Sequence, residues 1–239
     1  MKRQLLHKGK AKSVYTTNQE DQVIIEYRDD ASAFNGVKKA ALKDKGKLNN
    51  HLNAYLMEKL EAVGIKTHFI KQLSGQESLM KKLRMLPIEC VVRNYAAGGI
   101  CKRLGLQTGT KFNSPIFEFF LKDDPLGDPM INESHILSFN WATPHDIDFM
   151  KHTSFAVNRF LTELFDKADL LLVDFKLEFG RFKDHILLGD EVTPDGMRLW
   201  DKNTKEIFDK DRFRQDLGHV VAHYTEVARR IGLKLPVPS

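Results

Sequence analysis

The segment that decides the fold of this chain is LLLVDFKLEFG, residues 170–180. Side chains of a β-strand alternate between two faces, so Asp174, Lys176 and Glu178 share one face. The opposite, core-facing side carries Val173, Phe175, Leu177 and Phe179. A strand on a solvated surface would alternate in the same way. Residues 170–173 are apolar on both faces, however, which indicates that the strand starts inside the protein and that its polar half emerges from the core.

A hairpin after this strand would gather carboxylates. Gly180 and the polar residues that follow it permit a turn, after which residues 186–191 (ILLGDE) return along the strand. If the two strands pair in even register, Asp190 joins the face of Asp174 and Glu178. Such carboxylates repel one another unless a cation lies between them, and Mg²⁺ binds through one or two carboxylates plus substrate phosphates. The sequence alone leaves the register open.

Other segments carry residues suited to anions. Residues 9–12 (GKAK) join two candidate strands, and a glycine with two lysines can approach and neutralise a phosphate. They lack the second glycine and the Lys-Ser/Thr pair of a Walker A loop, and a basic turn on a solvated face is the alternative. Arg93 ends an apolar strand and is followed by small residues up to Gly99. Its planar donor set, like those of Arg198 and Arg214, suits carboxylate or phosphate, although each could equally be a surface arginine.

The rest of the pattern predicts an α+β fold, because strands come first and then mix irregularly with helices. We expect strands near residues 13–17, 22–27, 77–82, 89–95, 170–179 and 185–189. We expect helices over residues 47–63, from a Thr143 cap and Pro144 onward, and over residues 211–231. Residues 111–143 contain three prolines and several acids, and they predict mostly loop.

The composition excludes several classes of protein. The chain has 239 residues, 42% hydrophobic and 29% charged, as in an ordinary folded domain. A net charge of +5 suits an anionic ligand or a nucleic acid. A nucleic-acid-binding module would concentrate basic and aromatic residues on one surface, whereas this chain spreads its charges. Two cysteines argue against a disulfide scaffold, and the sequence predicts neither a signal peptide nor a membrane span. We therefore expect a cytoplasmic protein without a nucleic-acid or membrane partner.

Several motifs, in order along nearly the whole chain, resemble the phosphoribosylaminoimidazole-succinocarboxamide synthase (SAICAR synthetase) family. Two stretches resemble its signatures most closely: residues 86–98, from LPIE to Arg93 and Ala97-Gly98, and residues 174–180 (DFKLEFG). The other matching stretches are residues 9–12, 32–36, 128–132, 194–201 and 211–214. The resemblance implies a two-lobed fold with an ATP cleft between the lobes. Residues 1–84 would form a small β-rich ATP-binding lobe, and residues 85–239 a larger α+β lobe with metal and nucleotide-substrate sites.

The resemblance also implies a reaction. ATP, carboxyaminoimidazole ribonucleotide (CAIR) and L-aspartate would give the succinocarboxamide nucleotide, ADP and phosphate through an acyl phosphate, in purine biosynthesis. Another ATP-dependent ligase or a kinase on the same scaffold is the alternative within the enzymes. The family also implies a homodimer. Gly99 stands where members usually have Ser, and Asn35 where many have Asp.

The matching positions assign the site residues. Lys176 and Asp174 would be catalytic. ATP would contact Gly9, Lys10, Ala11, Lys12, Lys81 and Met85, and Mg²⁺ would be held by Glu178 and Asp190. The nucleotide substrate would be surrounded by Arg93, Gly99, Asp174, Lys176, Arg198 and Arg214. Candidates for the substrate and aspartate sites are Ser32, Lys122 and Asp128.

Overall fold

Strand β11 (Leu170–Phe182) holds the segment that decides the fold, and it lies inside a sheet rather than at its edge. The chain is described by a computed structural model over residues 4–33 and 36–236. β11 pairs with β8 on one side and with β12 and β13 on the other, all antiparallel. The sheet has the order β10-β9-β8-β11-β12. Its other strands are β8 (Arg84–Tyr95), β9 (Lys111–Leu121), β10 (Met130–Ile131), β12 (His185–Gly189) and β13 (Met197–Asp201).

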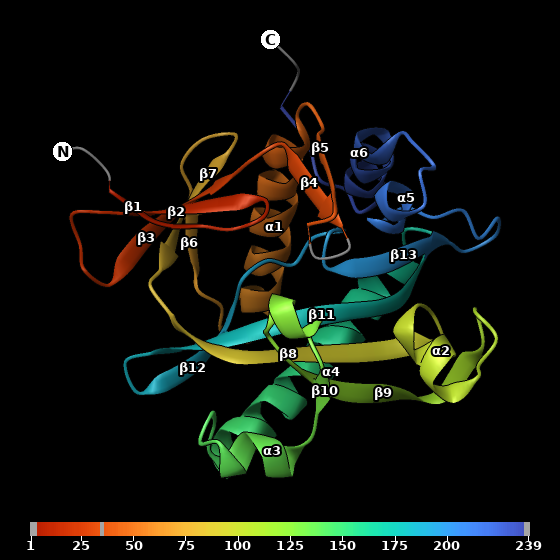
Figure 1. The fold of residues 1–239 in the computed structure, drawn as a ribbon. Coiled ribbons are helices and arrows are strands. Elements are labelled where there is room, and N and C mark those ends of the chain that lie inside the picture. The colour runs from red at the N-terminus through yellow and green to blue at the C-terminus, as the bar shows by residue number, and fades with distance from the viewer. Residues whose placement is uncertain (1–3, 34–35, 237–239) are drawn as a thin grey trace.

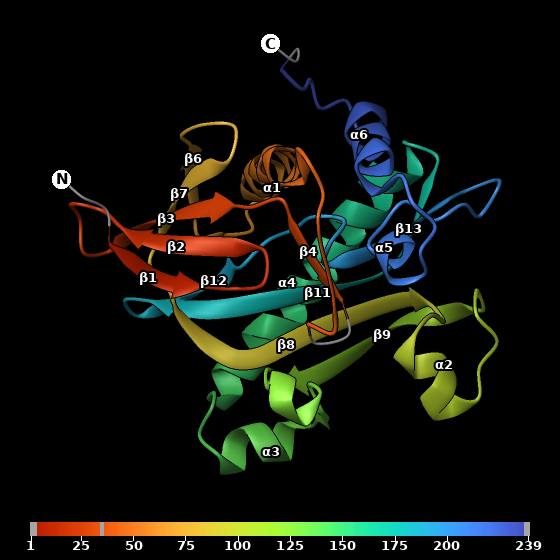
Figure 2. The ribbon, with the colours of Figure 1, turned by 45° about the horizontal axis from the view of Figure 1, so that its top comes forward.

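The N-terminal part of the chain builds a separate antiparallel sheet with the order β1-β2-β3-β7-β6, which we call the first sheet; the sheet that contains β11 is the second sheet. Its strands are β1 (Leu5–Lys8), β2 (Lys12–Thr16), β3 (Gln22–Tyr27), β6 (Phe69–Gln72) and β7 (Glu77–Lys81). A separate hairpin, β4 (Asp30–Ala33) and β5 (Lys38–Ala41), packs beside α5 (Asp211–Arg214) (Figures 1 and 2). Phe34 and Asn35, inside one of the matching stretches, lie outside the described residues.

The helices cover the sheets. α1 (Lys45–Ala62) packs on the first sheet, and α4 (Pro144–Asp166) packs on β8 and β11 (Figure 1). α4 begins as predicted, because the Thr143 hydroxyl accepts a hydrogen bond from the N–H of Asp146 while the Asp146 carboxylate accepts one from the N–H of Thr143. The remaining helices are α2 (Gly99–Leu104), the 3₁₀ turn η1 (Asp124–Leu126), α3 (Glu133–Ser138) and α6 (Val220–Arg230).

The two faces of β11 are both buried, for different reasons. Val173, Phe175, Leu177 and Phe179 are in the core, as predicted. Phe179 meets the ring of Phe149 on α4 edge to face, with 6.3 Å between ring centroids. Asp174 and Glu178 on the polar face are each only 4% exposed. Since a solvated strand would expose these carboxylates, the polar face of β11 belongs to an internal site.

The prediction that residues 111–143 are mostly loop is wrong, because these residues form β9, β10 and α3. β9 carries a proline, Pro115, which cannot donate a ladder hydrogen bond. The structure tolerates it because the β8–β9 register shifts between Arg93 and Tyr95, next to where Pro115 lies. β10 pairs only with Phe119 and Phe120 of β9, so the proline lies at an open edge on that side.

Two further boundaries were predicted wrongly. Gly180 lies within β11, and the turn to β12 comes after Phe182, where Lys183 has a left-handed φ of 54°. The C-terminal stretch is two helices, α5 and α6, instead of one. Gly218 and His219 interrupt it with φ of 67° and 54°, a conformation that no α-helix continues through.

The two sheets are connected closely. β7 ends at Lys81 and β8 begins at Arg84. An isolated parallel bridge joins Thr67 to Leu188 of the second sheet, and the Tyr55 hydroxyl on α1 donates to the carbonyl of Ile231 at 2.7 Å. Within the described ranges, no helix has the length and apolar character needed to cross a membrane.

Candidate active site

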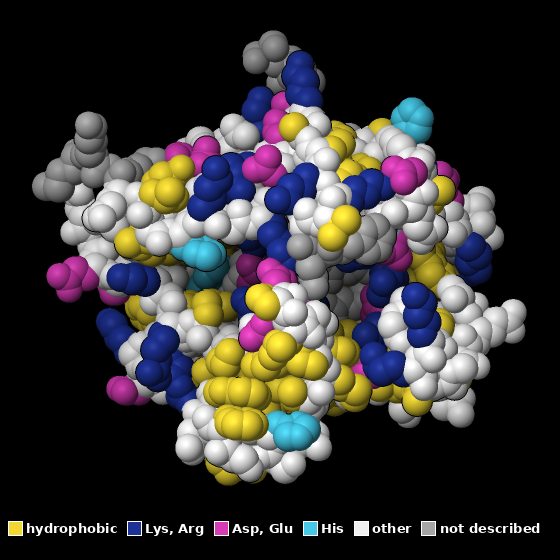
Figure 3. All heavy atoms as spheres, in the orientation of Figure 1, with side chains coloured by type: hydrophobic (Ala, Val, Ile, Leu, Met, Phe, Trp, Pro, Cys, Tyr) yellow, Lys and Arg dark blue, Asp and Glu magenta, His cyan; other side chains and the backbone are white. Residues whose placement is uncertain are grey.

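A cleft of about 1190 Å³ opens between the two sheets. Pockets for one small ligand span roughly 300–1,000 Å³, so this cleft has room for more than one reactant. Lys and Arg side chains gather around its mouth, with acidic side chains inside the hollow (Figure 3). Every site residue predicted from the sequence lines it. These residues are Gly9, Lys10, Ala11, Lys12, Ser32, Lys81, Met85, Arg93, Gly99, Lys122, Asp128, Asp174, Lys176, Glu178, Asp190, Arg198 and Arg214.

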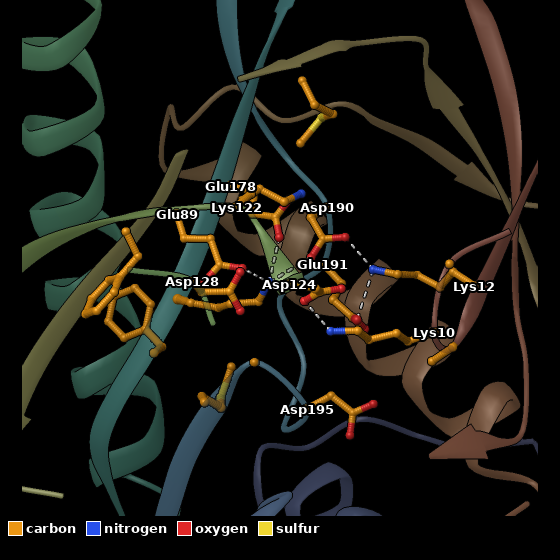
Figure 4. A pocket seen from close by; sticks show the side chains of 18 of the residues that line it. Lys10, Lys12, Glu89, Lys122, Asp124, Asp128, Glu178, Asp190, Glu191 and Asp195 are labelled. Carbon is orange, nitrogen blue, oxygen red and sulfur yellow. Dashed lines mark hydrogen bonds and ion pairs between the residues drawn. The ribbon is translucent and has the colours of Figure 1, made fainter. Parts of the chain in front are cut away.

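The turn between β1 and β2 carries the first cluster of positive charge. Gly9 closes it with a hydrogen bond to the carbonyl of Lys12 at 2.8 Å, and Arg28 ties it down by donating to the Gly9 carbonyl at 2.7 Å. Both lysines reach across the cleft (Figure 4): Lys10 Nζ lies 2.6 Å from an oxygen of Asp124, and Lys12 Nζ lies 2.5 Å from Asp190 Oδ1. The turn is thus bound to the second sheet through ion pairs.

Lys176 is the centre of the acidic cluster predicted on β11. Its Nζ lies 2.5 Å from Glu178 Oε1, 2.9 Å from Glu89 Oε1 and 3.8 Å from Asp190 Oδ2. Lys122 bonds the second oxygen of Glu178. Burial opposes the charge of Lys176, but the three carboxylates outweigh it and hold its pKa well above the ordinary value. Lysine side chains therefore neutralise the acids whose mutual repulsion the sequence had indicated.

Asp190 reaches this cluster by a route other than the even register. Glu178 stands opposite Gly189 in the β11–β12 ladder, so a regular strand would turn Asp190 to the other face. Asp190 instead follows the last residue of β12 and has a left-handed φ of 52°, which redirects its side chain. His68 donates a ring N–H to the Asp190 carbonyl at 3.0 Å. Burial lowers the pKa of His68 to about 4, so this donor is neutral.

The donor chemistry of the cluster fits Mg²⁺. In the part of the chain that the structure describes, no three His, Cys, Asp or Glu side chains are close enough to enclose a metal alone. Mg²⁺ does not require such a cage, since it binds through one or two carboxylates and completes its octahedron with water and phosphate oxygens. Glu178 and Asp190 meet through Lys176 and supply hard oxygen ligands. The residues present therefore suit a magnesium ion that arrives with a phosphate ligand.

At the other end of the cleft the predicted arginines are joined in a chain of alternating charge. Asp174 Oδ2 accepts from Arg93 Nη1 at 2.7 Å and from Arg198 Nη1 at 2.9 Å. Asp211 accepts from Arg198 Nε at 2.7 Å and from Arg214 Nη1 at 2.5 Å. The whole arginine chain, in order of contact, is Arg103, Glu118, Arg93, Asp174, Arg198, Asp211 and Arg214. It holds the guanidinium groups in fixed directions beside the cleft.

Two neighbouring glycines at the start of α2 differ in what they permit. Gly98 has φ of 64°, and a Cβ built on it would lie 2.5 Å from Arg198 Nη2, so only glycine leaves room for that guanidinium. A Cβ on Gly99 would make an ordinary contact, 3.5 Å from Arg103 Nη1. Gly98 is thus required by the arginine chain, whereas a Ser side chain would start without a clash at Gly99.

The structure adds residues that the sequence analysis missed. Glu89 pairs with Lys176, and Glu191 pairs with Lys12 at 2.9 Å. Asp195 and Lys210 also line the cleft. Glu89 lies four residues before Arg93 on β8, and strand alternation puts both on the face that carries the arginine, a signal that could have been read. No comparable signal marked Lys210, which precedes a helix of only four residues.

Comparisons with known proteins agree with one another. The family model described as SAICAR synthetase matches residues 5–231. The phosphoribosylaminoimidazole-succinocarboxamide synthase of Alcanivorax borkumensis is 60% identical over 232 residues, which cover 97% of this chain and 98% of that protein. The synthase of the same name from Acinetobacter baylyi is 57% identical over 235 residues, covering 98% of each chain.

Solved structures show the same likeness. The crystal structure of phosphoribosylaminoimidazole-succinocarboxamide synthase from Ehrlichia chaffeensis superposes with a TM-score of 0.95 at 44% identity, covering 98% of this chain and 100% of that one. A SAICAR synthetase in complex with ADP superposes with a TM-score of 0.93 at 42% identity, covering 97% and 99%. The mixed α+β fold is thus confirmed.

Proposed function

The chain belongs to the SAICAR synthetase family, and from this premise we propose how its cleft performs the reaction. The enzyme is an ATP-dependent ligase of purine biosynthesis that joins L-aspartate to the carboxylate of CAIR, giving SAICAR, ADP and phosphate. A carboxylate resists attack by an amine because it is negatively charged. Transfer of the γ-phosphoryl group of ATP to that carboxylate gives an acyl phosphate, whose phosphate then leaves as the aspartate amine attacks.

The ATP phosphates lie against the turn of residues 9–12, where Lys10 and Lys12 neutralise them. Lys81 assists from β7, and Met85 contacts the adenine. The ion pairs of Lys10 with Asp124 and of Lys12 with Asp190 support this assignment, because they show that both ammonium groups reach into the cleft. Phosphate oxygens replace those carboxylates as partners when ATP binds.

Glu178 and Asp190 would hold Mg²⁺, which would supply positive charge to offset that of the ATP phosphates. The oxygen-only donor set and the nearness of Lys12, an ATP ligand in this proposal, support the assignment.

The nucleotide substrate occupies the end of the cleft beside the arginine chain. Arg93, Arg198 and Arg214 recognise its anionic groups, with Gly99 offering its backbone. Asp174 keeps two of these guanidinium groups in place and also contacts the substrate. Preorganised donors of this kind stabilise charge without moving during the reaction.

Lys176 acts at the reacting carboxylate. Its ammonium stays protonated, since its pKa is held far above the ordinary value by the surrounding acids despite burial. A permanent cation there offsets the charge of the carboxylate and of the incoming phosphoryl group. Ser32, Lys122 and Asp128 serve the substrate and L-aspartate sites.

The single observation that carries this proposal is that residues from position 9 to position 214 converge on one cleft. A kinase or another ATP-dependent ligase would share the ATP end. The arginine chain favours the synthase, because it offers several guanidinium groups to a substrate that carries both a phosphate and a carboxylate.

The arrangement of the whole molecule is part of the proposal. Residues 1–84 form the ATP-binding lobe and residues 85–239 the lobe with the metal and nucleotide-substrate sites. We place the enzyme in the cytoplasm, and we expect a homodimer because the family implies one. Light scattering of the purified protein tests the dimer, and a monomer mass would contradict it.

The reaction is tested by coupled ADP release. Turnover should require Mg²⁺, ATP, CAIR and L-aspartate together, and phosphate release indifferent to aspartate would refute the ligase assignment. Glu178→Gln tests the metal site and should abolish turnover while the protein stays folded. Glu163→Gln, an exposed residue on α4, is the matched control and should leave activity unchanged. Near-normal turnover of Glu178→Gln would contradict the metal role.

A further inference from the structure

Lys210 differs from the other lysines deep in the cleft. Lys12, Lys122 and Lys176 each form an ion pair with a carboxylate. Lys210 also lines the cleft and is half-buried, yet within residues 4–33 and 36–236 no group accepts a hydrogen bond or ion pair from its side chain. A partly desolvated cation without a partner is unfavourable unless a ligand supplies the missing negative charge.

The charged groups around Lys210 do not supply the missing partner. Asp195 and, more weakly, Glu191 attract Lys210, but the oxygens of Asp195 are already used by other donors. Oδ2 accepts from Lys45 Nζ at 2.5 Å and from Asn49 at 2.9 Å, and Oδ1 accepts from the Tyr224 hydroxyl at 2.8 Å. Burial, together with repulsion from Lys45, lowers the pKa of Lys210 despite the attraction of Asp195. An anionic ligand beside Lys210 would therefore stabilise its charge.

A second orphan polar group lies on a neighbouring element. The Ser32 hydroxyl on β4 is buried and has no hydrogen-bond partner among the residues that the structure describes, and Ser32 also lines the cleft. β4 packs against α5, which Lys210 immediately precedes. A free cation and a free hydroxyl on adjoining elements form the donor set that a carboxylate takes.

We propose that Lys210 binds a carboxylate of the amino-acid substrate, L-aspartate, in the same reaction. The inference rests on the proposed function, which supplies the amino acid. The other anionic reactants already have cations assigned: the ATP phosphates have Lys10 and Lys12, and the nucleotide has the arginine chain. L-Aspartate carries two carboxylates, and within the described residues Lys210 is a cation of the cleft that forms no hydrogen bond or ion pair with a carboxylate.

The test is a set of steady-state measurements on Lys210→Met, with each substrate varied while the others saturate. The KM for L-aspartate should rise about 10- to 100-fold, the range that follows from losing one charge-assisted hydrogen bond. The KM values for ATP and CAIR should stay within about two-fold of wild type, since neither reactant contacts Lys210. Lys210→Arg, which keeps the charge, should recover part of the aspartate affinity.

Controls separate binding from folding. Lys167→Met removes an exposed lysine of α4 and should leave all three KM values unchanged. An unchanged melting temperature and ATP affinity of Lys210→Met establish that the variant folds. The inference is overturned if the CAIR or ATP KM rises instead of the aspartate KM, if kcat alone falls, or if Lys210→Arg is no better than Lys210→Met. Wild-type turnover that ignores aspartate would refute the proposed function itself, whatever the variants do.

Discussion

Gly180 allows a direct test of how β11 supports the ATP end of the cleft. A Cβ built on Gly180 would lie 2.8 Å from Leu83 Cβ, 3.0 Å from Met85 Sδ and 3.2 Å from the carbonyl oxygen of Arg84. Gly180 lies in an extended strand, so Gly180→Ala introduces no backbone strain and acts through these contacts alone. The substitution should therefore push the segment that joins the two sheets away from β11.

The size of the effect follows from which atoms can move. Overpacking a tight site costs typically about 1–3 kcal/mol of unfolding free energy. Met85 is flexible, but Leu83 Cβ and the Arg84 carbonyl are part of the backbone or fixed directly to it. We therefore expect a loss in the upper half of that range, about 2–3 kcal/mol. Because Met85 lines the cleft, the KM for ATP should rise several-fold, with the KM for L-aspartate unchanged.

Urea unfolding and steady-state kinetics measure both effects. Gly75→Ala is the matched control, since a Cβ there would lie 3.5 Å from the flexible chain of Lys47. It should be neutral or stabilise by up to about 1 kcal/mol through the unfolded state. If Gly180→Ala unfolds at the same urea concentration as wild type and keeps its KM for ATP, the proposed role of this contact is wrong.

Three other substitutions test buried charges. Lys45→Met leaves the carboxylate of Asp195 buried without its cation, so the unfolding free energy should fall by about 3–5 kcal/mol in urea titrations; a loss below about 1 kcal/mol would contradict this. Asp209→Asn tests pH dependence: burial and a neighbouring carboxylate raise the pKa of Asp209 to about 7 from 3.8, so the folded chain holds an extra proton between these values. The stability of wild type relative to Asp209→Asn should therefore fall as pH rises from about 4 to about 7, by at most about 4 kcal/mol, and a constant difference would refute the assignment. Asp174→Asn removes the charge that holds Arg198. It should raise the KM for CAIR about ten-fold or more and leave the KM for ATP unchanged. Equal increases in the two KM values would contradict the proposal that ATP and CAIR bind at opposite ends of the cleft.

The parts of the fold with strong local signals could be predicted from the sequence. The alternation in β11 and the Thr143–Pro144 start of α4 are local patterns, and the structure confirms both. β9 was missed because its proline and polar residues resemble a loop. What makes it a strand is its pairing with β8, a long-range contact that local sequence patterns do not reveal. The break at Gly218 depends on two left-handed residues that a helical pattern does not reveal.

In the site, too, local motifs could be predicted from the sequence, whereas features that depend on the three-dimensional arrangement could not. Every site residue predicted from the sequence lines the cleft, and most of them lie in recognisable motifs. The position of Asp190 could not be derived, since it depends on a single left-handed φ after the last strand residue. Lys210 carries no motif of its own, and only the arrangement of its neighbours in space shows that, within the described residues, it has no ion-pair partner.

The arginine chain has a consequence for how long the product stays. Its four arginines and three carboxylates sum to a single positive charge. The guanidinium groups are already oriented, so a phosphate that binds there immobilises few side chains and associates quickly. The carboxylates at the same time weaken the pull on that anion, which shortens its residence time. Such a site favours turnover over tight retention, because the same acids that orient the guanidinium groups also limit how strongly those groups hold an anion.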